Sequence, residues 1–124
     1  MKHDEYQIQK QVCQYLNWSY RDVLFISTGI PFDLSDKRGA RNKAIQKPNF
    51  KCPDLIIFEA RNGYNGLFIE LKVVTPFKKD GNIKKDVHLE GQLKTIQELE
   101  AKGYFSVFAT GFGEAKIIID KYLR

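Results

Sequence analysis

The sequence predicts an α/β domain built on a central mixed β-sheet flanked by helices. Two strand-like segments, 55–58 and 67–74, are joined by a cluster of turn residues at 62–66. A helix-like segment at 89–102 separates them from a further strand-like segment at 104–110. A helix between two strands is typical of a crossover connection. The 124 residues of the chain are enough for one such domain with one core, and too few for two.

The first element is an amphipathic helix expected at residues 4–17, where apolar side chains recur at helical spacing. Glu5 and Gln9 fall on the same line of this helix as its apolar stripe, because each residue is rotated by about 100° from the one before. Glu5 is therefore expected to point toward the core or along its edge, where a carboxylate needs a basic group or a metal ion. The alternative is that Glu5 lies in a frayed first turn in water, where it favours the helix dipole.

A short strand is predicted at residues 23–28, which are apolar and β-prone. The segment 32–51 that follows has little periodicity and allows either a short helix at 37–46 or a flexible loop. It is strongly basic, with no acid between residues 37 and 51. Its cations are Lys37, Arg38, Arg41, Lys43, Lys47 and Lys51. Such like charges repel one another unless they are solvated or bound to an anion. An exposed charged loop would explain them, but their position just before the strand pair favours a segment that binds nucleic-acid phosphates.

Three charged residues interrupt the strand pair. Asp54 begins the first strand, and Glu70 and Lys72 lie within the second. Because side chains alternate along a strand, Glu70 and Lys72 share one face, whereas Ile69 and Leu71 point the other way, into the core. Two carboxylates are suitable ligands for Mg²⁺ or Mn²⁺, and such an ion lowers the pKa of water and neutralises charge on a phosphodiester. The alternative is a hairpin with a buried Glu–Lys ion pair, which is a common arrangement.

The later elements continue the α/β pattern. Residues 75–82 form a loop whose neighbouring lysines are a second candidate DNA contact, although solvated surface is an adequate explanation. The helix at 89–102 carries Gln92 beside its apolar stripe, where a half-buried glutamine is usually a structural hydrogen-bonding residue. The strand at 104–110 is followed by a helix predicted at 114–123, whose isoleucine-rich middle would also suit a strand.

The composition is that of an ordinary globular protein, with 43% hydrophobic and 28% charged residues. No run approaches the about 20 apolar residues that span a bilayer, and residues 1–10 lack the apolar stretch of a signal peptide. We therefore expect a cytoplasmic protein without a membrane partner, in which Cys13 and Cys52 are reduced thiols. The cysteines and the two histidines do not show zinc-ligand spacing. The net charge of +5 favours an anionic partner.

The polar residues of the strand pair carry a resemblance to a known family. Pro53-Asp54 followed by Glu70-Leu71-Lys72 resembles the PD-(D/E)xK nuclease signature. The context resembles the VRR-NUC branch of that superfamily, in particular the small stand-alone proteins of phages and bacteria. The resemblance extends from Glu5 to Leu123 and is weakest between Leu24 and Phe50. The residues that carry it beyond the signature are Gly66–Ile69, Gly91-Gln92, Gly103-Tyr104, Glu114-Ala115 and Tyr122-Leu123. The family often has Gly-x-Pro-Asp, whereas Lys51-Cys52 precede Pro53 here.

The resemblance implies a restriction-endonuclease-like core in a single domain, residues 1–124, of a bacterial or phage-infected cell. It also implies a metal-dependent DNA endonuclease. Asp54, Glu70 and the backbone carbonyl of Leu71 would bind Mg²⁺ or Mn²⁺, and an acidic residue on the first helix, here Glu5, would join the metal site. Some stand-alone members act as dimers on branched DNA such as four-way junctions, so a homodimer is a further expectation.

The resemblance also assigns catalytic residues. A glutamine one helix after the Glu-x-Lys strand belongs to the family's active site, which gives Gln92 the role of positioning the water, Lys72 or a phosphate. Lys72 would orient the attacking water or offset the negative charge that develops on the phosphate. Together with Asp54 and Glu70, these residues form the predicted catalytic set.

Two other functions are compatible with the sequence. A non-catalytic nucleic-acid-binding module with a nuclease-like fold would bind DNA without metal-dependent cleavage. An α/β interaction domain whose charges are only surface would show no salt-sensitive DNA binding. The presence of all the candidate polar residues argues against a domain that has lost catalysis. These residues are Glu5, Asp54, Glu70, Lys72 and Gln92.

Overall fold

The computed structural model describes residues 2–28 and 37–124, and the side chains of residues 4–28 and 40–124. The elements in these ranges are α1 (Lys2–Ser19), β1 (Phe25–Ser27), α2 (Lys37–Ile45), β2 (Leu55–Ile57), β3 (Leu67–Lys72), α3 (Val87–Ala101), β4 (Phe105–Thr110) and α4 (Gly111–Leu123). No helix of the described ranges is both long enough and apolar enough to cross a membrane.

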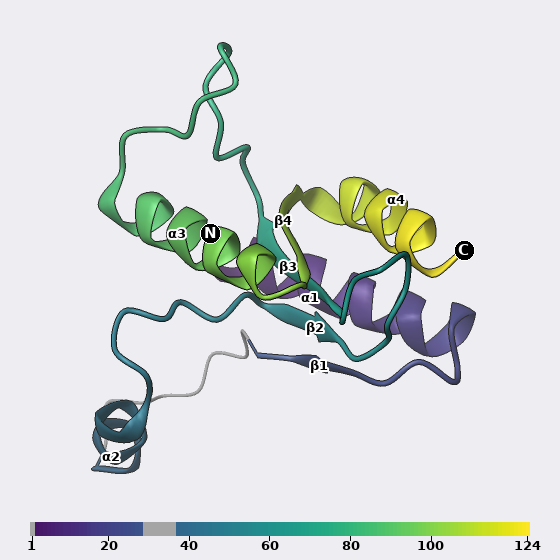
Figure 1. Ribbon diagram of the computed structural model, residues 1–124, viewed down its shortest axis with the longest axis horizontal. Helices are drawn as coiled ribbons and strands as arrows, with labels where there is room; N and C mark the ends of the chain where they lie inside the picture. Colours follow the sequence, from purple (N-terminus) through teal and green to yellow (C-terminus); the bar gives the residue numbers. More distant parts are fainter. Residues whose placement is uncertain (1, 29–36) are drawn as a thin grey trace.

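The strands form a four-stranded mixed sheet in the order β1-β2-β3-β4, with helices on both sides (Figure 1). β1 pairs antiparallel with β2, and β2 pairs antiparallel with β3. β4 lies parallel to β3, because α3 carries the chain back between them. The predicted α/β class with a central mixed sheet is confirmed, and so is the predicted crossover through the helix before β4.

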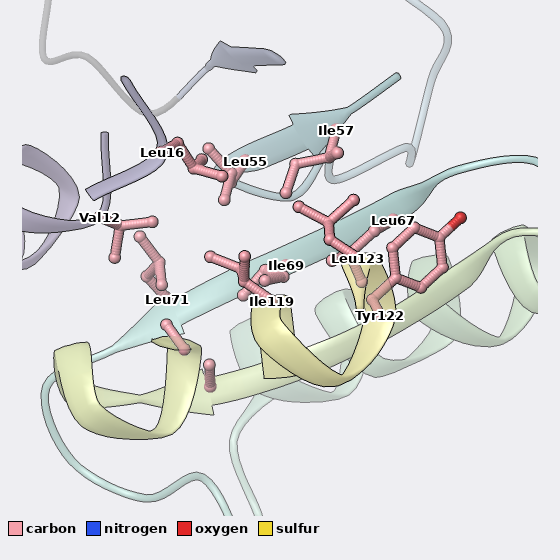
Figure 2. Close-up of a cluster of buried hydrophobic side chains, with 12 residues drawn as sticks. Val12, Leu16, Leu55, Ile57, Leu67, Ile69, Leu71, Ile119, Tyr122 and Leu123 are labelled. Atoms are coloured by element: carbon pink, nitrogen blue, oxygen red, sulfur yellow. The ribbon is translucent and has the colours of Figure 1, made fainter. Parts of the chain in front are cut away.

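The core lies between one face of the sheet and the helices α1 and α4 (Figure 2). Ile69 and Leu71 of β3 point into it, with exposed fractions of 0% and 5%. Val12 of α1 and Ile119 of α4 pack against the same cluster and are fully buried. The predicted alternation along β3 is therefore confirmed, and Glu70, which lies between these two residues, faces the opposite side of the sheet.

α3 covers that opposite side by packing against β4. Its buried residues include Gln92, Thr95 and Ile96. The helix begins at Val87, earlier than its apolar stripe indicated, because Asp86 caps its first turn. The Asp86 carboxylate accepts a hydrogen bond of 3.1 Å from the backbone N–H of Leu89. The cap fixes the first turn of the helix that carries Gln92.

α4 follows β4 without a loop. The chain turns at Gly111, whose φ of 77° lies in the left-handed region that glycine adopts without strain. The helix then extends to Leu123 and buries Ala115, Ile119 and Tyr122. The helical prediction for this segment is confirmed, although the helix begins three residues before the predicted Glu114. The alternative of a strand over its isoleucine-rich middle is wrong.

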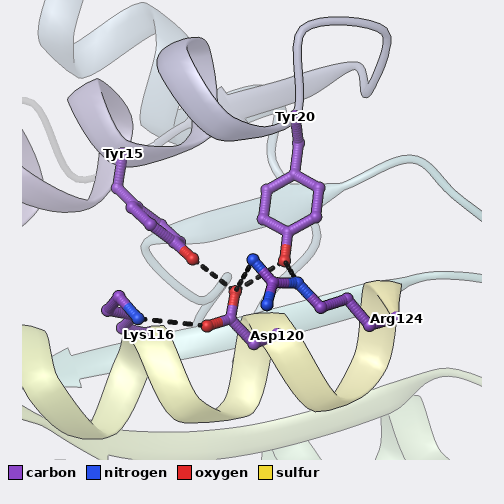
Figure 3. A network of polar contacts seen from close by, with 5 residues as sticks. All are labelled: Tyr15, Tyr20, Lys116, Asp120 and Arg124. Atoms are coloured by element: carbon purple, nitrogen blue, oxygen red, sulfur yellow. Dashed lines mark hydrogen bonds and ion pairs between the residues drawn. The ribbon is translucent and has the colours of Figure 1, made fainter.

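A polar cluster joins α1 to α4 on the surface, and we call it the tyrosine–aspartate cluster (Figure 3). Its members are Tyr15, Tyr20, Lys116, Asp120 and Arg124. The hydroxyls of Tyr15 and Tyr20 each donate a hydrogen bond of 2.5 Å to Oδ1 of Asp120. Lys116 Nζ lies 3.2 Å from Oδ2 of Asp120, and Arg124 Nε donates to the Tyr20 hydroxyl at 2.9 Å. Burial disfavours the ionised form of Asp120, but these donors outweigh it and hold its pKa below the usual 3.8.

α2 stands apart from the sheet and from the other helices (Figure 1). Its described side chains, from residue 40 to its end, are exposed to solvent, as are those of the connection that leads to residue 51. A short helix was one of the two alternatives predicted for this basic segment, and the structure shows it at Lys37–Ile45.

Candidate active site

Asp54 lies at the entry to β2, where pairing with β3 ends. Its backbone carbonyl accepts a hydrogen bond of 2.7 Å from the N–H of Thr28, just beyond β1. Its carboxylate Oδ2 accepts a hydrogen bond of 2.9 Å from the backbone N–H of Leu71. The last ladder pair between these strands joins Leu55 to Ile69. The Asp54 side chain thus provides the acceptor for the N–H of Leu71, and its carboxylate is held beside β3.

Glu70 projects from β3 toward α3 and meets the Asp54 carboxyl. Glu70 is only 4% exposed. Burial and the neighbouring Asp54 carboxyl raise the pKa of Glu70 well above the usual 4.5, and Lys72 opposes this effect only in part. We call Asp54 and Glu70 the acid pair. Ionisation of both neighbouring carboxyls is unfavourable where Glu70 is buried, unless a cation lies beside them.

Gln92 connects α3 to the acid pair. Its Nε2 donates a hydrogen bond of 2.6 Å to Oε1 of Glu70. The same Nε2 lies 3.2 Å from Nε2 of His88, one turn earlier on α3, so the ring nitrogen of His88 acts as the acceptor. The Oε1 of Gln92 is buried and has no hydrogen-bond partner among the described atoms. The amide therefore fixes Glu70 with its donor and leaves an acceptor unused.

Lys72 follows Glu70 by two residues on β3, as predicted for one strand face. It is half-buried, and its ammonium lies 5.9 Å from the centre of the Phe108 ring on β4. An ammonium over the face of an aromatic ring is attracted by the ring's negative face. This position leaves a positive charge close enough to act on the pKa of Glu70.

Lys51 brings the end of the basic segment against α3. Its backbone N–H donates a hydrogen bond of 3.0 Å to Oγ1 of Thr95, which is fully buried. A Cβ atom at position 91 would lie 2.6 Å from Cε of Lys51, so Gly91 leaves room for the lysine side chain to cross the helix. Of the predicted phosphate-binding residues whose side chains are described, Lys51 is thus the one that the structure brings next to the helical turn of Gln92.

The other members of the basic segment lie farther along the chain, toward α2. Arg41, Lys43 and Lys47 are exposed to solvent. The side chains of Lys37 and Arg38 lie outside the described residues. A role of these cations in binding phosphates stays a prediction.

Glu5 is exposed in the first turns of α1. Gln9, the next residue on the same face of α1, is buried with an exposed fraction of 8%, and Val12 is fully buried. The core-facing line of α1 therefore begins at Gln9, and Glu5 lies beyond it in solvent, in agreement with the solvated alternative for its position. A role for Glu5 in binding metal stays a prediction.

The donors around the acid pair fit a hard divalent cation. Among the described residues, no three His, Cys, Asp or Glu side chains are gathered into a metal site. Mg²⁺, however, is commonly bound by one or two carboxylates and keeps several waters, so the acid pair is sufficient. The contact between the Asp54 and Glu70 carboxyls and the unused Oε1 of Gln92 are the two observations that favour a cation here. Whether the carbonyl of Leu71 joins it stays a prediction.

Sequence reasoning did not identify His88 as part of the site. A histidine four residues before Gln92 lies on the same face of a helix, so this spacing was the signal that could have found it. It also did not identify Thr28 and Thr95, which fix the two ends of the segment from Lys51 to Asp54. Threonine is too common in both strands and helices for its pattern to reveal such a role.

The structure was compared with known proteins. No family model matches the sequence, and no curated protein matches it significantly. A solved structure described as a VRR_NUC domain protein is similar to it with a TM-score of 0.61 at 25% sequence identity. The similarity covers 97% of this chain and 88% of that one. The chain therefore has a nuclease-like α/β fold that matches a VRR_NUC domain, which confirms the resemblance predicted from its sequence.

Proposed function

We propose that the protein is a metal-dependent DNA endonuclease that hydrolyses phosphodiester bonds. The observation that carries this proposal is the acid pair itself. Asp54 is held by the backbone of Leu71, and Glu70 is held by the amide of Gln92. A fold whose main role was stability would gain little from placing the half-buried carboxyl of Asp54 beside the buried carboxyl of Glu70, because such a pair repels when ionised.

Each residue of the site has a distinct role in this proposal. Asp54 and Glu70 hold Mg²⁺ or Mn²⁺, which supplies the lowered pKa of water and the positive charge that hydrolysis of a phosphodiester needs. Lys72 places its ammonium beside the site, where it offsets negative charge that develops on the phosphate. Gln92 keeps Glu70 in position with its Nε2 and offers Oε1 as an acceptor for a hydrogen bond from the attacking water.

The basic segment would hold the DNA. Lys51 lies against α3 beside the turn that carries Gln92, and Arg41, Lys43 and Lys47 continue away from it along the exposed connection. Contacts of this kind bind the phosphate backbone without reading bases. The affinity should therefore fall steeply with salt, by about one power of salt concentration for each phosphate contacted.

The test is cleavage of labelled DNAs by the wild type and by Lys72→Ala, in Mg²⁺, Mn²⁺ or EDTA. The substrates are a duplex, a flap, a single strand and a four-way junction, because the predicted homodimer would suit a junction. We expect cleavage that needs the metal and is lost in Lys72→Ala. The matched control is Lys121→Ala, which removes an exposed lysine from α4 and should cleave as the wild type does.

Two results would count against the proposal. Cleavage that continues in EDTA would show that the acid pair does not work through a metal ion. Salt-sensitive DNA binding without cleavage under any condition would instead favour the non-catalytic nucleic-acid-binding module.

A further inference from the structure

We propose that the groove between α3 and the connection from α2 to β2 binds unpaired nucleotides of the DNA, with one base stacked on Phe50. This inference rests on the proposed nuclease function and names its substrate class. The preferred substrate is DNA that has a single-stranded segment next to the cleaved bond, rather than a blunt duplex.

The groove has a volume of about 340 Å³. One wall is the segment that leads from α2 to β2, which runs alongside α3 (Figure 1). The other wall is the C-terminal half of α3 and the residue after it. The lining residues that matter here are Lys47, Phe50, Lys94, Glu98, Leu99 and Lys102. A groove with this set of residues combines one aromatic ring, an apolar floor and several positive charges.

The aromatic ring is the feature that points to a base. Phe50 is 41% exposed although it is a large apolar side chain, whereas Leu99, which lines the same groove, is only 7% exposed. Every base has an apolar π-face, and proteins that bind single strands stack such faces on exposed aromatic rings. Within a duplex the faces of the bases are already covered by their neighbours, so Phe50 can stack only on an unpaired or terminal base.

The charges of the groove match the phosphates of the same strand. Lys47, Lys94 and Lys102 line it, against one acid, Glu98, among its described lining residues. Lys94 and Lys102 are eight residues apart, which is about 12 Å along a helix that rises 1.5 Å per residue. That distance corresponds to about three nucleotides of a stacked strand. A positively charged track beside an aromatic ring is the usual design of a single-strand binding site.

The groove and the acid pair both lie against α3, and Lys51 lies between them along the chain. Lys51 follows Phe50 directly and is fixed to the helix through Thr95. Its side chain crosses Gly91, and the next residue, Gln92, holds Glu70. A strand that leaves the groove past Lys51 therefore reaches the acid pair within one to two turns of α3.

The test is binding in EDTA, where the nuclease cannot cleave. The probes are a blunt DNA duplex and the same duplex with a short overhang that carries 2-aminopurine at its first unpaired position. We expect the wild type to bind the overhang more tightly and to quench the 2-aminopurine fluorescence through stacking. Phe50→Leu should weaken overhang binding by about tenfold and abolish the quenching. Its binding of the blunt duplex should remain within twofold of the wild type.

Three further variants make the outcome specific. Phe50→Tyr keeps an aromatic ring and should bind the overhang as the wild type does. Trp18→Leu removes a 78%-exposed aromatic from α1 and should change neither probe. The double variant Lys94→Ala, Lys102→Ala should lower the salt dependence of overhang binding by about 1.4 powers of salt concentration.

The inference is overturned if the wild type binds both probes equally, or if Phe50→Leu weakens them to the same extent. Because binding is measured without metal, either outcome leaves the cleavage assay unaffected. Conversely, a protein that does not cleave can still show the stacking, so failure of the nuclease proposal and failure of this inference are distinguishable.

Discussion

The acid pair and the tyrosine–aspartate cluster place carboxylates in contact with other polar groups, with opposite results. Asp120 receives two tyrosine hydroxyls and an ammonium, and its pKa is lowered. Glu70 meets a second carboxyl in a buried position, and its pKa is raised. The tyrosine–aspartate cluster is complete within the protein, whereas the negative charge of the acid pair is offset only in part, by Lys72. This difference separates a cluster that joins two helices from one that is suited to bind a cation.

The largest effect that follows from this difference is on cleavage. Glu70→Gln keeps the size of the side chain but removes one negative charge, so we expect cleavage to fall by at least about a hundredfold. Asp120→Asn should leave the cleavage rate of the folded protein unchanged. Thermal unfolding with and without Mg²⁺ gives a second readout. The ion should raise the Tm of the wild type and of Asp120→Asn but not that of Glu70→Gln. A metal-induced shift that survives in Glu70→Gln would place the ion elsewhere.

The second effect is on stability, and here Asp120→Asn rather than Glu70→Gln should cause the larger loss. Asp120→Asn removes the charged acceptor of Tyr15 and Tyr20 and should lower the free energy of unfolding by about 1–3 kcal/mol. Glu70→Gln should leave the metal-free protein as stable as the wild type or more stable at neutral pH, because it removes a carboxyl that is difficult to ionise. Urea denaturation in EDTA measures both. A larger loss for Glu70→Gln than for Asp120→Asn would contradict the comparison.

The third effect is a dependence of stability on pH. The pKa of Glu70 is higher in the folded protein than the usual 4.5, so above that pH the folded state holds more protons than the unfolded state. The free energy of unfolding of the metal-free protein should therefore fall as the pH rises from 5 to 8. The fall from this group is at most about 1.4 kcal/mol per pH unit. Glu70→Gln should remove that slope.

The same denaturation series should also show stability that is lost at low and at high pH, because of Asp120 and Tyr20 in the tyrosine–aspartate cluster. The lowered pKa of Asp120 contributes stability above pH 3.8 that is lost on further acidification. Burial and the hydrogen bond to Asp120 raise the pKa of Tyr20 to about 12, so its contribution is lost as the pH rises above 10. Asp120→Asn should reduce the losses of stability at low and at high pH. It should leave the slope of the free energy of unfolding between pH 5 and 8 as in the wild type.

The smallest effect concerns His88. His88→Ala removes the second acceptor of the Gln92 amide and should lower the cleavage rate by about two- to fivefold, because one neutral hydrogen bond is lost. His88→Asn, which keeps an acceptor, should restore part of the rate. An unchanged rate in His88→Ala would show that Glu70 alone is enough to orient the amide.

The parts of the fold that depend on local pattern could be predicted from the sequence. The alternation of Ile69 and Leu71 with Glu70 and Lys72 is a property of any strand, and the structure confirms that the two apolar residues are in the core. For the short helix α2 the sequence favours neither helix nor loop, because few apolar residues mark a face there. The helical period allows both positions of Glu5, because the period does not show how far the sheet extends beneath the helix.

The contacts between distant residues could not be predicted. Asp120 meets Tyr15 and Tyr20 across 105 and 100 residues of the sequence, and no local pattern connects them. The hydrogen bond from Lys51 to Thr95 is of the same kind. The acid pair was an exception, because its residue types and spacing resemble a family signature even though their contact spans a hairpin.

The hydrogen bond from the N–H of Leu71 to the Asp54 carboxylate has a further consequence for ligand binding. It restricts the rotation of the aspartate side chain before any ion arrives, and Gln92 restricts Glu70 in the same way. An ion that enters the site therefore causes little additional loss of side-chain conformational entropy, which in a more mobile pair of acids would subtract from the binding free energy. In the proposed metal site, the backbone of β3 would thus pre-organise the two carboxylates, and the affinity for the ion would depend mainly on charge and on the release of water.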